Sequence, residues 1–224
     1  MYDKELYGED FHKKRDEETS HSAEVILNIL KDYLDIESVC DVGCGVGTWL
    51  AHCGTESILG IDGEYKEGMM KIPGDCFRVA DLARPIEGDI GRYDLCISLE
   101  VAEHLPKNRA ESFVKDLCNI SDNVLFSAAF IGQNGVGHIN ENTIHYWRRI
   151  FKKNGYKMID CVRPFIYEDK SIPAWYRRNI VLFVKSDRIA ERLSKFENKR
   201  ISYSIDIEKV MASIKKRIKR NRHA

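Results

Sequence analysis

The sequence predicts an α/β protein whose mostly parallel sheet is covered by helices on both faces. Short apolar runs, typical of buried strands, alternate with stretches whose apolar residues recur at helical spacing. Glycines or carboxylates follow several of these apolar runs directly. Because parallel sheets bind ligands at the carboxyl ends of their strands, those segments are where we expect a site.

The predicted elements follow one another in order along the chain. Ser20 or Ser22 is the expected N-cap of the first helix, and Gly155 is expected to end the last one. The amphipathic stretches predict helices over the following residues: 19–34, a short segment from Thr48, 107–120 and 143–156. The apolar runs predict strands over the following residues: 38–44, 57–62, 76–82, 93–99, 123–130, 157–167 and 179–185.

The bulk composition is that of a globular protein with one main domain. Hydrophobic residues make up 43% and charged residues 31% of the 224 residues, and the formal net charge is zero. A neutral chain has no overall field that would attract nucleic acid. The absence of a long apolar run and of a signal-peptide core predicts a cytoplasmic location. The seven cysteines contain no CxxC pair, so we expect reduced, mainly buried thiols.

A glycine-rich loop, "DVGCGVG" at residues 41–47, follows the first predicted strand and precedes a helix. Asp62 ends the second strand, where an acid can accept hydrogen bonds from both hydroxyls of a ribose. The spacing is GxGxG rather than the GxGxxG of dinucleotide sites, and Asp41 would repel a phosphate. S-adenosylmethionine has no phosphate and carries a sulfonium and an ammonium. The loop therefore favours this cofactor over a dinucleotide, although a glycine-rich turn without any ligand remains the alternative.

The motifs together resemble those of class I S-adenosylmethionine-dependent methyltransferases. The matching segments are "VCDVGCGVGTWL", "GID" at 60–62, "VADL" at 79–82 and "YDLCISLEVAEHLP", within residues 20–185. The resemblance implies a Rossmann-like fold with a seven-stranded sheet, in which the last strand, residues 179–185, runs antiparallel. It also implies that the cofactor is S-adenosylmethionine.

The resemblance assigns parts of the cofactor to particular residues. It implies that Asp41 and Gly43 to Gly47 line the methionine end of the cofactor and that Asp62 binds its ribose. It also implies that Asp81 and Leu82 flank the adenine. A lid over the cofactor is implied for an N-terminal segment, residues 1–18, assisted by Ser22. The complete set of expected cofactor-binding residues is Asp41, Gly43, Cys44, Gly45, Gly47, Asp62, Gly63, Asp81, Leu82, Leu99, Tyr7 and Phe11.

The segment "LEVAEHLP" places Glu100, Glu103 and His104 at spacings i, i+3 and i+4. If a helix starts after Ser98, all three project from one face. One interpretation is a helix cap with solvated neighbours, and a second makes His104 a general base, since the ordinary pKa of histidine is about 6.5. The third is a divalent metal site, because carboxylates and an imidazole suit Mg²⁺ or Mn²⁺.

The ExxEH pattern resembles the metal-binding motif of ubiquinone-biosynthesis O-methyltransferases and of small-RNA 2′-O-methyltransferases. In the latter, a histidine from the loop after the fifth strand completes the site, and His138 is the candidate here. The expected metal ligands are therefore Glu100, Glu103, His104 and His138, with Glu103, His104 and His138 also expected to take part in catalysis. A metal would lower the pKa of a coordinated hydroxyl, which favours O-methylation of a diol.

The C-terminal half, from about residue 137, resembles small methyltransferases of polysaccharide and natural-product pathways. We therefore expect a small-molecule or glycan acceptor. Candidate acceptor-pocket residues are Asn140, Glu141, Trp147, Arg163, Trp175, Arg177 and Arg178, with core packing favoured for Trp147. The alternatives are an RNA ribose 2′-O-methyltransferase and a non-catalytic, cofactor-binding scaffold subunit.

The methyltransferase domain is expected over residues 19–186 and a basic helical tail over residues 187–224. Within the tail, residues 207–218 place apolar residues on one helical face and Lys or Arg elsewhere. Such a helix can dock on its own domain or on a second copy of the chain. It can also lie on an anionic membrane surface, which would make the protein peripheral to a membrane. Nucleic acid is the least favoured partner.

Overall fold

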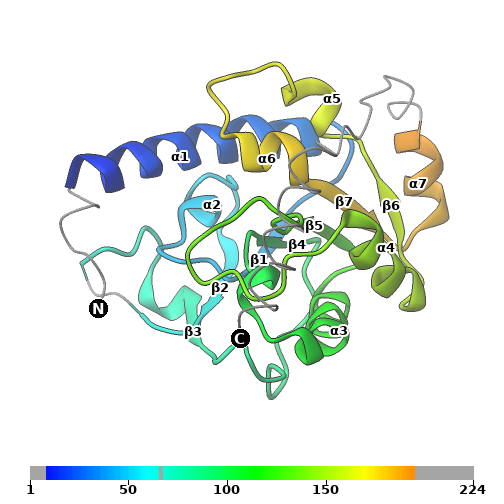
Figure 1. The fold of residues 1–224 in the computed structure, drawn as a ribbon, viewed down its shortest axis with the longest axis horizontal. Coiled ribbons are helices and arrows are strands. Elements are labelled where there is room, and N and C mark those ends of the chain that lie inside the picture. The colour runs from blue at the N-terminus through cyan, green and yellow to red at the C-terminus, as the bar shows by residue number, and fades with distance from the viewer. Residues whose placement is uncertain (1–8, 66–67, 195–224) are drawn as a thin grey trace, which may run out of the picture.

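The computed structural model describes residues 9–65 and 68–194 and, within α1, side chains from residue 17 onward. Its centre is one seven-stranded sheet in the order β3-β2-β1-β4-β5-β7-β6 (Figure 1). The first five strands in this order are mutually parallel, and β7 is antiparallel to both of its neighbours. The predicted sheet, including its antiparallel last strand, is confirmed. The strands are β1 Ser38–Val42, β2 Ser57–Asp62, β3 Phe77–Val79, β4 Leu95–Leu99, β5 Asn123–Ser127, β6 Lys157–Ile159 and β7 Val181–Val184.

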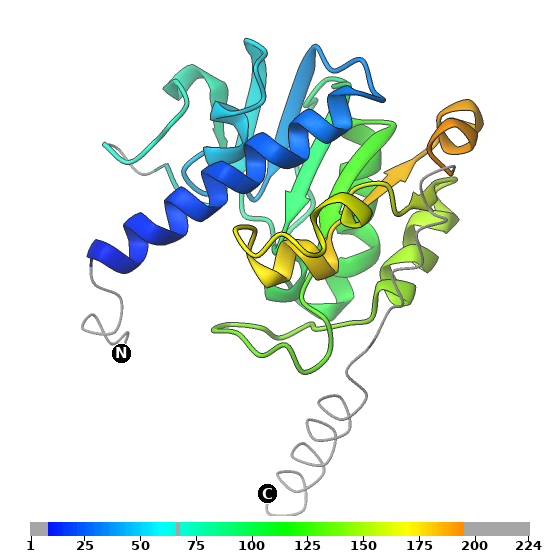
Figure 2. The same cartoon turned by 90° about the horizontal axis from the view of Figure 1, so that it is seen from above.

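Helices cover both faces of the sheet, as the sequence predicts. The long helix α1 lies across one face, and α3 lies on the other (Figure 2). The α-helices are α1 Glu9–Lys31, α2 Thr48–Ala51, α3 Ala110–Ile120, α4 Ile144–Lys153, α5 Arg163–Ile166, α6 Ala174–Asn179 and α7 Asp187–Ser194. Three single turns of 3₁₀ helix cover Gly74–Cys76, Ala102–His104 and Lys107–Arg109. None of the helices in the described ranges is long and apolar enough to cross a membrane.

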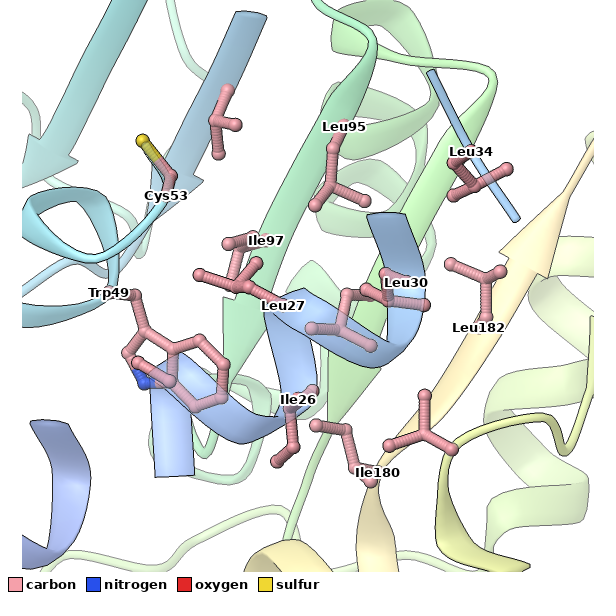
Figure 3. Close-up of a cluster of buried hydrophobic side chains, with 14 of the residues drawn as sticks. Ile26, Leu27, Leu30, Leu34, Trp49, Cys53, Leu95, Ile97, Ile180 and Leu182 are labelled. Atoms are coloured by element: carbon pink, nitrogen blue, oxygen red, sulfur yellow. The ribbon is translucent and has the colours of Figure 1, made fainter. Parts of the chain in front are cut away.

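Alternate residues along each strand point to opposite faces of the sheet, and their side chains contribute to two apolar cores. On one face, Leu27 and Leu30 of α1 pack in a cluster with Leu95 and Ile97 of β4 and Leu182 of β7 (Figure 3). The aromatic core on the other face consists of Phe126, Trp147, Phe151, Tyr156 and Phe183, in which Phe151 and Phe183 stack with ring centroids 3.8 Å apart. Trp147 is 1% exposed, which confirms that it is a core residue rather than a wall of an acceptor pocket.

The first helix begins earlier than the sequence predicts. α1 starts at Glu9 and not near Ser20 or Ser22. Ser22 lies inside the helix, and its hydroxyl donates a hydrogen bond to the carbonyl of Glu18, one turn back. This back-bonding within a helix is the alternative to capping that serine hydroxyls offer. Ten residues of the predicted N-terminal lid, 9–18, are therefore continuous with the first core helix.

The predicted strand over residues 157–167 is also corrected. Only Lys157–Ile159 pair with β7, and the chain then turns into α5 at Arg163. Pro164 explains the change, because proline cannot donate to a strand ladder but fits the first turn of a helix. α6 follows Pro173 in the same way; the sequence analysis predicted no helix there and assigned Asn179 to the following strand.

The domain continues beyond residue 186, where the sequence analysis placed its end. Ala190 and Leu193 of α7 are buried in the same core as α1, and Asp187 pairs with Lys157 at 2.8 Å. The apolar residues Ile189, Ala190 and Leu193 at helical spacing explain this docking. The basic segment 207–218 lies outside the described residues.

We expect Leu193→Ala to lower the free energy of unfolding by about 2–5 kcal/mol, because it leaves a cavity under α7. Leu193 is 0% exposed. Arg188→Ala on the exposed side of the same helix is the matched control and should change stability by at most about 0.5 kcal/mol. Urea unfolding of the two variants measures the difference. Equal stabilities would show that α7 does not belong to the cooperative core.

Candidate functional site

The glycine-rich loop joins β1 to α2 at the carboxyl edge of the sheet. Gly43, Gly45 and Gly47 have φ of 86°, 57° and 83°, a region that side chains with a Cβ disfavour. At Gly43 a Cβ would also lie 2.2 Å from Cγ2 of Val101, so this position excludes any other residue. At Gly45 a Cβ would meet nothing within 4 Å, so the missing side chain leaves open space beside the loop.

A pocket of about 240 Å³ opens in front of this loop, and we call it the glycine-loop pocket. Loop residues, the ends of β1 and β4 and the three helices α1, α2 and α6 supply its walls. It is lined by Thr19, Asp41, Gly43, Cys44, Gly45, Val46, Thr48, Trp49, Leu99 and Tyr176. Asp41 is 2% exposed, and burial, followed by the nearby Asp62 carboxylate, raises the pKa of its carboxyl group. The pocket therefore presents threonines and aromatic rings on its helical side and the Asp41 carboxyl group at the strand end.

Asp62, at the end of β2, is held by the loop itself. Its Oδ2 accepts a hydrogen bond from the backbone N–H of Gly45 at 2.7 Å, and its Oδ1 accepts one from Gly63 at 2.6 Å. Each carboxylate oxygen can accept a second hydrogen bond. Asp62 is thus fixed in place and retains acceptor capacity for a ligand.

The segment after β4 does not form the expected helix. Glu100 has a left-handed φ of 56°, and only Ala102–His104 make a turn of 3₁₀ helix. Glu100 therefore does not share a helical face with Glu103 and His104, and the predicted one-face arrangement is wrong. A left-handed glutamate cannot be read from an i, i+3, i+4 spacing, because that spacing presumes helical dihedral angles throughout.

Three residues nevertheless come together beside this turn. Glu103, His104 and His138 each offer one ligand atom, and these atoms lie within 4.8 Å of one another. The two imidazole rings meet edge to face, with centroids 4.8 Å apart. We call Glu103, His104 and His138 the Glu103 cluster. The structure thus places His138, as predicted, beside two of the three ExxEH residues.

The charges in the Glu103 cluster are unusual. Glu103 is 0% exposed, and neither carboxylate oxygen is in hydrogen-bond geometry with a protein donor, while the backbone N–H groups of Glu103 and Ala129 lie near enough to favour its ionised form. Burial, followed by the charge of Glu100, raises the pKa of Glu103 to about 8. Burial and the neighbouring His138 lower the pKa of His104, which favours its neutral form. An unpartnered, fully buried carboxyl beside two imidazoles costs stability unless a cation or a proton satisfies it.

The loop after β5 is tied down so that His138 reaches the cluster. The backbone N–H groups of Ile139 and Asn140 both donate to the carbonyl of Glu103 at 2.9 Å. Glu141 accepts from Gly132 N, Asn134 N and His138 Nδ1 at 2.9, 2.9 and 3.0 Å. The Glu141 carboxylate orients the His138 ring, as carboxylate partners also do for metal-binding histidines. The side chain of Glu141 and the backbone of Asn140 therefore stabilise the loop and are not walls of an acceptor pocket.

Comparisons with solved structures show which known fold the chain shares. The chain resembles magnesium protoporphyrin IX methyltransferase from Synechocystis PCC 6803 with a TM-score of 0.52 and 23% identity, covering 81% of this chain and 88% of that one. It resembles DesVI from Streptomyces venezuelae with a TM-score of 0.60 and 13% identity, covering 83% and 100%. The chain has the class I methyltransferase fold. No protein-family model and no curated protein matches the sequence.

A third similar structure is a small RNA methyltransferase, with a TM-score of 0.54 and 15% identity. The match covers 75% of this chain and 25% of that one. Identities this low show the shared methyltransferase fold and nothing about the acceptor of this chain.

Within this methyltransferase fold, five of the expected cofactor-binding residues line the glycine-loop pocket together. They are Asp41, Gly43, Cys44, Gly45 and Leu99. Gly47 instead starts α2, where its positive φ is the structural requirement. Asp81 follows β3, and its exposed carboxylate accepts from the N–H of Ala83. Gly63 adjoins Asp62, and Leu82 is packed in a core. Tyr7 and the side chain of Phe11 lie outside the described residues.

Pocket residues that the sequence analysis missed come from segments distant in sequence. Thr19 belongs to α1, and Tyr176 to α6; the Tyr176 ring meets Trp49 edge to face, with centroids 5.4 Å apart. Its sequence neighbours Trp175, Arg177 and Arg178 were expected in an acceptor pocket, but nothing in the sequence assigned Tyr176 to this wall of a methyltransferase fold.

Three arginines proposed for the acceptor have structural or surface positions. Arg163 is 3% exposed, pairs with Asp160 at 2.5 Å and donates to the carbonyl of Arg178. Arg177 donates to the carbonyls of Ile172 and Tyr167, both at 2.8 Å. Arg178 is exposed. Arg163 is therefore a packing residue, because its guanidinium is already fully engaged in a buried ion pair.

Proposed function

We propose that this chain is an S-adenosylmethionine-dependent O-methyltransferase. We infer that it acts on a hydroxyl of a saccharide or similar small hydroxylated acceptor with help from a divalent metal ion. The observation that carries this proposal is the Glu103 cluster at the end of the strand that lines the glycine-loop pocket. Leu99 lines the pocket, and Glu103 follows it by four residues. A methyl donor and a site that can activate a hydroxyl would thus be neighbours.

The residues present fit S-adenosylmethionine. The cofactor supplies a methyl group on a positively charged sulfonium, and Asp41 and Asp62 make the strand ends acidic. Asp62 has lone pairs left for two ribose hydroxyls after binding Gly45 and Gly63. The open space at Gly45 lets backbone approach a ligand closely. We assign the methionine end of the cofactor to Asp41 and the glycine-rich loop, and its ribose to Asp62.

The Glu103 cluster fits a divalent ion. Both oxygens of Glu103 lack a hydrogen-bond donor at a fully buried position, which a cation would satisfy. One carboxylate and two imidazoles are borderline ligands, which favours Mn²⁺ over Mg²⁺. When bound, such an ion lowers the pKa of a coordinated hydroxyl. The lowered pKa of His104 keeps its free imidazole neutral, so in the absence of the ion it could accept the acceptor proton itself.

Asp62→Ala should weaken S-adenosylmethionine binding by about 1.5–3 kcal/mol, because the ribose hydroxyls lose a charged acceptor. Asp81→Ala is the matched control, since that carboxylate is exposed and already accepts from Ala83 N; it should have a smaller effect. Isothermal titration calorimetry on both folded variants gives the affinities. Unchanged affinity in Asp62→Ala would refute the ribose assignment.

The acceptor class is tested by methyl transfer from labelled S-adenosylmethionine to sugars, catechols and short RNAs, with and without Mn²⁺. Metal-dependent labelling of a sugar or another small hydroxylated compound supports the proposal. RNA ribose 2′-O-methylation is the second candidate, because His138 joins Glu103 and His104 from the loop after β5. Labelling of RNA alone would select that candidate. Tight cofactor binding without transfer to any acceptor would favour a scaffold subunit.

A further inference from the structure

Glu100 has an uncommon backbone conformation at the end of β4. Its φ of 56° lies in the left-handed region, which glutamate rarely adopts. Its N–H donates to both the carbonyl and the hydroxyl oxygen of Ser127 at 3.1 Å, which fixes the turn. Strained conformations of this kind persist only where surrounding contacts enforce them, and they concentrate at functional sites.

Two amides hold the Glu100 side chain. Asn179 Nδ2 donates to Oε1 at 3.1 Å and lies 3.4 Å from Oε2, and Gln133 Nε2 donates to Oε2 at 3.1 Å. Asn179 Nδ2 also donates to Gln133 Oε1 at 2.9 Å, which closes a triangle of side chains. We call Gln133 and Asn179 the Glu100 clamp. It joins the loop after β5 to the end of α6, and Asn179 is 7% exposed.

The clamp gives two neighbouring carboxylates different partners, while the charge of Glu100 still acts on Glu103. The atoms of the Glu103 cluster converge within 4.8 Å of one another, and Glu100 is not part of that group. Both Glu100 oxygens already have amide donors, whereas both Glu103 oxygens have none. A carboxylate satisfied by neutral amides gains less from a cation than an unsatisfied one. The two glutamates therefore have different partners available to them.

We propose that Gln133 and Asn179 are positioning residues that keep Glu100 out of the metal ligand set, so that Glu103, His104 and His138 are the ligands. This inference rests on the proposed function and concerns the same site. Fewer protein ligands leave more coordination positions for oxygens of the acceptor, which suits a substrate with two neighbouring hydroxyls.

The test is a Mn²⁺ titration of the full chain, without cofactor or acceptor, followed by the electron paramagnetic resonance signal of free Mn²⁺. Glu100→Gln should keep the Mn²⁺ dissociation constant within about threefold, whereas Glu103→Gln should raise it by roughly 30-fold or more. Gln133→Ala/Asn179→Ala should bind Mn²⁺ roughly fivefold more tightly, because the freed carboxylate can reach the ion. Adding Glu100→Gln to that pair should abolish the gain.

The outcomes separate this inference from the proposed function. If Glu100→Gln weakens Mn²⁺ binding as much as Glu103→Gln, Glu100 is a ligand and the inference is overturned, while the metal-assisted function stands. If the clamp variants show no gain, the positioning role is overturned. Gln133→Met keeps the volume of a half-buried side chain and should show a smaller gain in Mn²⁺ affinity. This single variant tests the same role if the double variant does not fold. No Mn²⁺ binding by the unaltered chain would overturn metal assistance itself and the inference with it.

Discussion

We expect Glu103→Gln to abolish the proposed metal-supported methyl transfer and to leave the protein folded. We expect a loss of at least about 100-fold in activity, because the variant removes the charged ligand of the Glu103 cluster. The free energy of unfolding of the metal-free protein should stay equal or rise. The reason is that Glu103 is 0% exposed and its carboxylate oxygens have no donor, so folding gains nothing from the ionised side chain.

Labelled-methyl transfer and urea unfolding in the presence of a chelator measure the two effects on one preparation. Glu111→Gln is the matched control, since Glu111 is exposed and pairs only with the exposed Lys153; it should leave both quantities nearly unchanged. A Glu103→Gln variant with full activity would exclude Glu103 from catalysis. A variant that is inactive only because it unfolds would show that the carboxylate is structural.

Gly43→Ala should destabilise the fold by about 2–5 kcal/mol. A residue with a Cβ pays about 1–2 kcal/mol in the left-handed region, and overpacking adds about 1–3 kcal/mol. The overpacking follows because the new Cβ would lie 2.2 Å from Cγ2 of Val101, a β-branched side chain that cannot swing away. The same displacement of Val101 disturbs the turn that carries Glu103.

Gly45→Ala is the matched variant, with a different expected result. Its φ is 57° and its Cβ would meet nothing within 4 Å, so only the backbone cost of about 1–2 kcal/mol remains. Its methyl group would project into open space at the glycine-loop pocket, which should weaken S-adenosylmethionine binding. Thermal unfolding and calorimetry distinguish the two. Equal destabilisation by both substitutions would contradict the contact between Gly43 and Val101.

The strands and most helices were predictable because buried apolar residues recur at regular spacings or in continuous runs along the sequence. The nearly continuous apolar runs in "YDLCISL" and "NVLFSAAF" are typical of strands buried on both faces. These segments form β4 and β5. Boundaries were less predictable where local and tertiary preferences compete. The polar residues 9–18 have no apolar face, and the helix there extends α1 from a core that begins at Ala23. Pro164 does mark the first turn of α5, but its signal was outweighed by the apolar residues beside it.

The candidate site, like the fold, has a part that the sequence predicts and a part that depends on tertiary packing. The sequence by itself determined the glycine loop, the acids Asp41 and Asp62 at adjacent strand ends, and the candidate ligands Glu100, Glu103 and His104 after the fourth strand, whereas His138 came from a resemblance. Only the tertiary structure decided that Glu100 lies outside the group that Glu103, His104 and His138 form, and that Thr19 and Tyr176 enter the pocket wall. The physical reason is that these contacts join segments up to 157 residues apart, as Thr19 and Tyr176 are. Spacing along the chain records which residues share an element, whereas the partners of a side chain depend on which elements pack together.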